Sequence, residues 1–137
     1  MMDRPLSNME IAALVWERIQ DSRLGKTVPG MHWHHHPDNP EGEFIVIWPL
    51  AGSVGDIQTG YVNVNIYVPD KMPTVGGQKQ RAPDIGRLKE LSALAYDALK
   101  SFPLNERWFF DVAEETLISE GDLPYTFANY EVKLKKY

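Results

Sequence analysis

The sequence predicts a single α+β domain over residues 1–137, in which two helices pack on one face of a mostly antiparallel, four-stranded sheet. Two segments carry apolar residues at helical spacing, and residues 61–68 alternate strictly between polar and apolar side chains. The elements follow one another in the order αββαββ. A chain of 137 residues has the length of one typical domain and can bury a core without disulfides or metals.

The first helix is predicted over residues 6–25. Ser7 and Glu10 have the S-x-x-E spacing of a capping box, in which each side chain accepts a hydrogen bond from a free amide of the first turn. Gly25 marks the expected end of the helix. One apolar face is expected to reach the core, made of Ile11, Leu14, Val15 and Ile19.

The next two elements are strands. Residues 27–42 lack apolar periodicity and predict a long connection, and residues 44–48 form a strand that Pro49 ends. The clearest strand spans residues 60–70, where four β-branched side chains point to the core: Val62, Val64, Ile66 and Val68. Its other face carries hydrogen-bonding groups and rings but no charge: Tyr61, Asn63, Asn65 and Tyr67. That face suits contact with another subunit or sheet, and an ordinary hydrated face explains it equally well.

The second half repeats the helix-strand-strand order. Residues 71–82 form a second loop, made flexible by Gly76 and Gly77, and a helix follows between Pro83 and Pro103. Residues 108–119 predict a strand with an interruption near residues 113–115. The last strand spans residues 126–137, with inward-facing Tyr130, Val132 and Leu134.

All four histidines lie between His32 and His36. In an extended segment His32, His34 and His36 share one face, and two of them could converge on a metal ion. A complete site needs a further ligand from elsewhere, and no residue in the sequence is singled out for it. We therefore expect a polar loop with no metal and no cofactor. A small metal-dependent enzyme that uses His32 and His34 is the alternative.

No catalytic residue is assigned, and we expect that the protein is not an enzyme. Absence of cysteine excludes a disulfide, a thiolate nucleophile and a cysteine zinc site. Asp111, Glu114 and Glu115 could form a carboxylate pair, but without a partner motif they indicate a solvated strand edge. No signal peptide and no apolar run of about 20 residues is present, so a soluble, intracellular protein is expected.

Charge is distributed unevenly. The net charge is −5, although residues 71–81 and residues 133–137 each carry three positive charges and no negative one, which leaves −11 on the rest of the chain. Such polarity can orient a protein against a partner, and two solvated basic edges are the plainer explanation. The basic segments are too small to predict direct recognition of nucleic acid.

The chain resembles the tail-terminator, or tail-completion, proteins of long-tailed phages and prophages. The similarity rests on the αββαββ order, the FIVIW strand after an irregular segment, the valine-rich GYVNVNIYVPD strand, the DIGRLKELSALAYDALKSF helix and the final TFANYEVKLKKY strand. It covers nearly the whole chain as a pattern of elements. The histidine segment, residues 31–42, departs from the more compact members and leaves a neighbouring head–tail joining protein as a possibility.

The resemblance implies a structural role in virion assembly. Such proteins form a ring, typically a hexamer, which stops growth of the tail tube and joins the tail to the head. The implied partners are other copies of the chain, the tail-tube protein and the head-side connector, with no membrane involved. The implied locations are the host cytoplasm during assembly and then the tail or neck of the virion. A monomeric head–tail adaptor stays open as a third reading.

Candidate contact residues follow from the long loops and from the polar strand face. Interfaces favour aromatic side chains and arginine, and long loops often order on docking. We expect substitution of Arg81 or Trp33 to weaken assembly while leaving the fold intact. The full set of candidates is Trp33, Tyr61, Asn63, Asn65, Tyr67, Lys71, Lys79 and Arg81.

Overall fold

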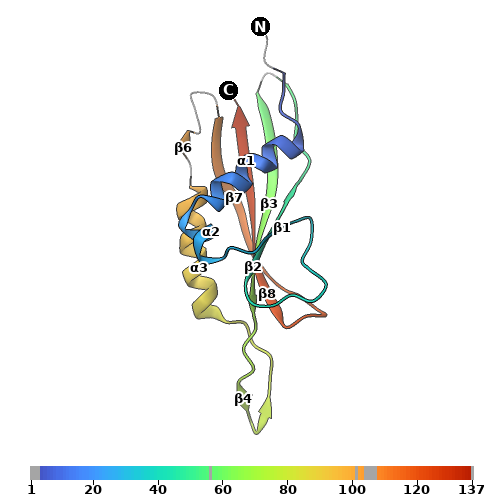
Figure 1. Ribbon diagram of the computed structural model, residues 1–137, viewed down its shortest axis with the longest axis vertical. Helices are drawn as coiled ribbons and strands as arrows, with labels where there is room; N and C mark the ends of the chain where they lie inside the picture. Colours follow the sequence, from blue (N-terminus) through green and yellow to red (C-terminus); the bar gives the residue numbers. More distant parts are fainter. Residues whose placement is uncertain (1–3, 56, 101, 104–107, 137) are drawn as a thin grey trace.

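A computed structural model describes residues 4–55, 57–100, 102–103 and 108–136. Within these residues a mixed sheet has the strand order β1-β2-β3-β8-β7-β6, and its long strands are antiparallel. A separate two-stranded hairpin, β4–β5, projects from one end of the molecule, opposite the end where both termini lie (Figure 1). The strand bounds are β1 Met31–Trp33, β2 Phe44–Pro49, β3 Gln58–Pro69, β4 Thr74–Val75, β5 Gln78–Lys79, β6 Phe102–Pro103, β7 Trp108–Ser119 and β8 Tyr125–Lys136.

Three helices are present in the described chain: α1 Asn8–Gln20, α2 Arg23–Thr27 and α3 Ile85–Leu99. The predicted capping box of α1 is confirmed, because the Ser7 side chain accepts from the Glu10 amide and Glu10 accepts from the Ser7 amide. The predicted end at Gly25 is wrong. α1 stops at Asp21, and Gly25 lies inside the short helix α2. α3 also ends before Pro103, with Lys100 as its cap.

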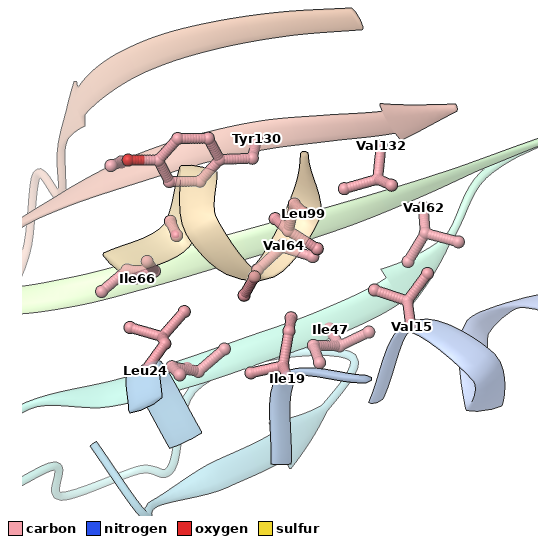
Figure 2. Packing of buried hydrophobic residues seen from close by; sticks show 14 of the residues in the cluster. Val15, Ile19, Leu24, Ile47, Val62, Val64, Ile66, Leu99, Tyr130 and Val132 are labelled. Carbon is pink, nitrogen blue, oxygen red and sulfur yellow. The ribbon is translucent and has the colours of Figure 1, made fainter. Parts of the chain in front are cut away.

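The main core lies between the helices and one face of the sheet. Alternate residues of β3 and β8 point into it, and Figure 2 shows Val62, Val64 and Ile66 packed toward Ile19 and Leu99 from the helices. The four inward residues predicted on β3 and the three predicted on β8 are all buried. The predicted interruption of the 108–119 strand is also confirmed, as a shift in register between Val112 and Glu114.

The α+β class is confirmed, but the four-stranded antiparallel αββαββ arrangement is wrong. Met31–Trp33, in the predicted loop, forms a parallel edge strand against Ile45–Ile47. This strand has only three residues and pairs through backbone groups, so its sequence shows no alternating pattern, although Met31 packs against the main core. β6 pairs with Phe109 and Phe110, and the predicted 71–82 loop contains the β4–β5 hairpin.

Candidate assembly surfaces

The face of the sheet away from the helices, here called the open face, carries four of the predicted contact residues. Tyr61, Asn63, Asn65 and Tyr67 alternate with the buried valines of β3, so they point away from the main core. In register they lie beside residues of β8 from Phe127 to Lys133. The prediction of a shared face is therefore confirmed, but its two ends have different environments.

At one end of the open face, aromatic rings form a second core. Phe44 stacks on Tyr67, with ring centroids 4.5 Å apart, and Tyr67 stacks on Phe127 at 4.6 Å. Tyr125 lies tilted against Phe44 at 5.4 Å. Phe44 and Tyr67 are only 2% and 5% exposed. Burial, with a smaller contribution from the charge of Glu120, raises the pKa of Tyr67 to about 12.

The histidine segment forms part of the cover of this second core. His34 has a positive φ of 78°, which ends β1 and turns the chain back across the open face. The His32 and His36 rings then meet Phe44 and Tyr67 edge-on, each with centroids 5.9 Å apart. Further along, the Gly42 carbonyl accepts a hydrogen bond of 2.9 Å from the Tyr125 hydroxyl. The segment that was expected to be a polar loop therefore covers buried aromatic surface.

The histidine rings face aromatic side chains or nearby carbonyls. His34 packs edge-on against Trp48 at 4.3 Å, and Nδ1 of His35 and of His36 lies 2.7 Å from the carbonyls of His36 and Pro37. Among the described residues, no three side chains of the His, Cys, Asp or Glu type are grouped closely enough to hold a metal ion.

At its other end the open face is polar. Asn129 on β8 donates to the side-chain oxygens of Asn63 and Asn65, at 3.2 and 2.5 Å. Lys133 lies over the Tyr61 ring, 5.7 Å from its centroid. β3 thus carries no charged side chain on the open face, as expected, whereas β8 places charged side chains such as Lys133 beside it.

Trp33 is separated from these residues. Its register partner on β2 is Ile47, a residue of the main core, and its ring stacks on Trp16 of α1 with centroids 4.3 Å apart. The side chain is 38% exposed. Replacing Trp33 would remove a contact within the chain, so this residue is a poor test of assembly alone.

The basic residues of the second predicted loop lie in residues 71–81, here called the arm, which include the β4–β5 hairpin. Every residue from Lys71 to Arg81 is exposed. Gly76 and Gly77, both with positive φ, form the two-residue turn. A Gly-Gly pair between two short extended segments is a hairpin signal. The prediction of a flexible loop over residues 71–82 overlooked it.

Two of the three basic side chains hold the base of the arm. Arg81 lies 3.2 Å from the Asp70 carboxylate and donates to the Leu123 carbonyl at 3.0 Å. Lys71 lies 3.5 Å from Asp84. Lys79 has no such partner among the described residues, so it is the basic side chain that the arm presents to its surroundings.

The outer edge of β7 is a surface that the sequence did not predict. β6 pairs with β7 only at Phe109 and Phe110, so no described strand covers the rest of this edge. Leu117 and Ile118 are 53% and 40% exposed there. Beside the edge, a groove of about 290 Å³ runs between α3 and the sheet, lined by Ile85, Leu88, Leu117, Ala128 and Tyr130 among others.

Tyr130 provides a prediction for this groove. Its hydroxyl is buried without a hydrogen bond of ordinary geometry from the described residues, and burial raises its pKa to about 12, which the nearby Ser92 hydroxyl only partly offsets. We expect Tyr130→Phe to leave the free energy of unfolding unchanged or to raise it by up to about 1 kcal/mol, because an unpaired buried hydroxyl costs free energy. Urea denaturation measures this. A loss above about 1 kcal/mol that Ser92→Ala reproduces would instead show a bond between the two hydroxyls.

Comparison with known proteins supports the fold only. Neither a protein-family profile nor a curated protein sequence matches this chain. Among the matching chains of solved structures, one has 20% sequence identity and a TM-score of 0.51, with 97% of each chain covered, and its name describes no function. In the described part of the chain, no helix is long and apolar enough to cross a membrane.

Proposed function

We propose that the protein is a tail-terminator-like structural protein of a phage or prophage, without enzymatic activity. Copies of the chain would form a ring, typically of six, at the end of the tail tube. The ring would stop growth of the tube and join the tail to the head. In this proposal the protein acts in the host cytoplasm during assembly and stays in the tail or neck of the virion.

One structural observation carries the proposal: the molecule presents two unlike surfaces that no part of the described chain covers. One is the projecting arm with Lys79, and the other is the acidic outer edge of β7, with Glu114 at its register shift. A ring needs head-to-tail contacts between different surfaces of each subunit, and opposite charge favours their pairing. The resemblance of the sequence to tail terminators gives this ring its biological setting.

The open face is the proposed surface for the tail-tube protein or the head-side connector. Its polar half has hydrogen-bonding groups at half-buried positions, with Asn63, Asn65 and Tyr61 in one row. Its aromatic half is already covered by the histidine segment. Neither proposed partner requires this protein to recognise nucleic acid directly.

Native mass spectrometry of protein purified without a histidine-binding resin tests the proposal. We expect a ring, with a hexamer as its size, and no tightly bound metal. A monomer that carries one transition-metal ion per chain, lost in a His34→Ala variant, would contradict the proposal in favour of a metal site. Lengths of tail tubes assembled with and without the protein, measured by electron microscopy, test termination itself: without it, tubes should exceed their normal length.

A further inference from the structure

We propose that the arm of one copy adds to the outer edge of β7 in the next copy, with β5 of the arm as the pairing strand. This inference rests on the proposed ring and names its subunit contact. The argument uses the open edge, the charges of the two surfaces, the two faces of the arm and the direction in which it projects.

The edge of β7 is available for a further strand. β7 is twelve residues long, and among the described residues its outer side is paired at Phe109 and Phe110 alone. No described strand uses the outward backbone groups from Asp111 to Ser119. Long exposed edges promote pairing with other chains, and many proteins shorten, twist or cover them. The register shift after Val112 bends this edge only near its start. The remaining length exceeds the short strands of the arm.

Charge favours the arm as the added strand. Residues 111–120 of β7 and the turn after it carry four carboxylates and no positive charge, whereas residues 71–81 carry three positive charges and no carboxylate. Glu114 also lies directly opposite Glu131 of β8 on the open face. Like charges in this position destabilise a strand pair. A lysine placed beside Glu114 by another copy would relieve that repulsion, and Lys79 is exposed and has no charged partner among the described residues.

The alternation of the arm matches the two faces of the edge. Lys79 pairs with Thr74, and Gln78 pairs with Val75, so the charged and apolar side chains lie on opposite faces of the hairpin. With Lys79 on the open face near Glu114, Val75 turns toward the helix side. There Val75 would meet the groove beside Leu117. Both side chains are exposed in the single chain, Val75 by 51% and Leu117 by 53%, so the contact would bury apolar surface on both copies. A single docking pose therefore pairs Lys79 with Glu114 and also places Val75 against Leu117.

The arm projects away from the sheet that it would extend, so the contact forms between copies (Figure 1). Its base is held in this direction by Arg81, which binds Asp70 and the Leu123 carbonyl. The arm and the β7 edge are different surfaces of the same copy. Such head-to-tail contacts continue from copy to copy and close into a ring when the rotation permits.

Crosslinking in mixtures tests this contact, because the chain has no cysteine. One variant carries Thr74→Cys on the arm, on the same face as its register partner Lys79, and a second carries Thr116→Cys on the open face of β7. Both variants keep Lys79 and Glu114. A short bis-maleimide is added to each variant alone and to an equal mixture. We expect a crosslinked dimer in the mixture and none, or far less, in either variant alone. Lys26→Cys, at an exposed position of α2, replaces Thr116→Cys in a control mixture that should not crosslink.

Other outcomes would overturn the contact in distinguishable ways. Strong crosslinking of Thr116→Cys alone would show that two β7 edges pair with each other. A ring in native mass spectrometry without the mixed crosslink would place the subunit contact elsewhere and leave the proposed function standing. A monomer at millimolar concentration with no crosslink would contradict both the contact and the ring.

Charge reversal provides a second test with the same protein. Lys79→Glu and Glu114→Lys should each weaken self-association about tenfold, since reversal replaces the attraction of an exposed ion pair by repulsion. The double variant should recover most of the loss, because each contact again joins opposite charges. Equal weakening in the double variant, or no effect of either single change, would contradict the pairing of these two residues.

Discussion

Phe44→Ala is expected to lower the free energy of unfolding by about 3–5 kcal/mol, the usual cost of removing a buried aromatic ring. Phe44 is 2% exposed and lies at the centre of the second core, stacked on Tyr67 at 4.5 Å and tilted against Tyr125 at 5.4 Å. It also meets the edge of the His32 ring. The loss should therefore loosen the histidine segment as well as the sheet.

Urea denaturation and hydrogen exchange together measure these two effects. Trp48→Ala is the matched control for the free energy of unfolding alone, since Trp48 is another aromatic residue of β2 on the open face but is 38% exposed, and its ring contacts His34 of the segment. It should cost clearly less than Phe44→Ala. Faster exchange of the His34 amide, which donates to the Ile47 carbonyl at 3.1 Å, would report loosening of the segment. A cost for Phe44→Ala equal to that of the control would mean that the second core contributes little.

The elements predicted most accurately are those whose signals are local. The capping box of α1 needs only Ser7 and Glu10, three positions apart, and it forms as predicted. The alternation of residues 61–68 fixes the inward face of β3 whatever its neighbours are. Even the interruption near residues 113–115 was visible, because the pattern itself breaks there.

The features missed depend on residues far apart in the sequence. Nothing near His32 or His36 indicates the rings of Phe44 and Tyr67, which strand pairing brings beneath them. A parallel strand as short as β1 has no pattern of its own, because its partner Ile45–Ile47 decides its pairing. The exposed edge of β7 could not be predicted either, since strand order follows from the whole sheet. The sequence correctly predicted that Tyr61, Asn63, Asn65 and Tyr67 share one face of β3. It did not predict that Tyr67 is buried in a second core.

Gly25→Ala is expected to destabilise the protein by about 2 kcal/mol, despite the position being helical. Alanine favours a helix interior over glycine by ~1 kcal/mol. At Gly25, however, a Cβ atom would lie 2.3 Å from the Ile19 carbonyl oxygen and 2.8 Å from the Gln20 Cα. These are backbone atoms at the end of α1, so they can yield only if α2 moves away. Overpacking of this kind costs ~1–3 kcal/mol, occasionally more, and exceeds the gain in helix propensity.

Moving α2 to make room for the Cβ atom would also disturb the main core, so the cost is larger than that of a local rearrangement. Leu24, next to Gly25, is fully buried in the main core, and the chain turns after α2 toward β1. Gly121→Ala is the control, because no atom lies within 4 Å of its added Cβ and its φ is not positive. That change should be neutral or stabilise by up to ~1 kcal/mol through the unfolded chain. If thermal or urea denaturation finds the two variants equally stable, then α2 is free to shift and the close packing of Gly25 on α1 does not constrain the fold.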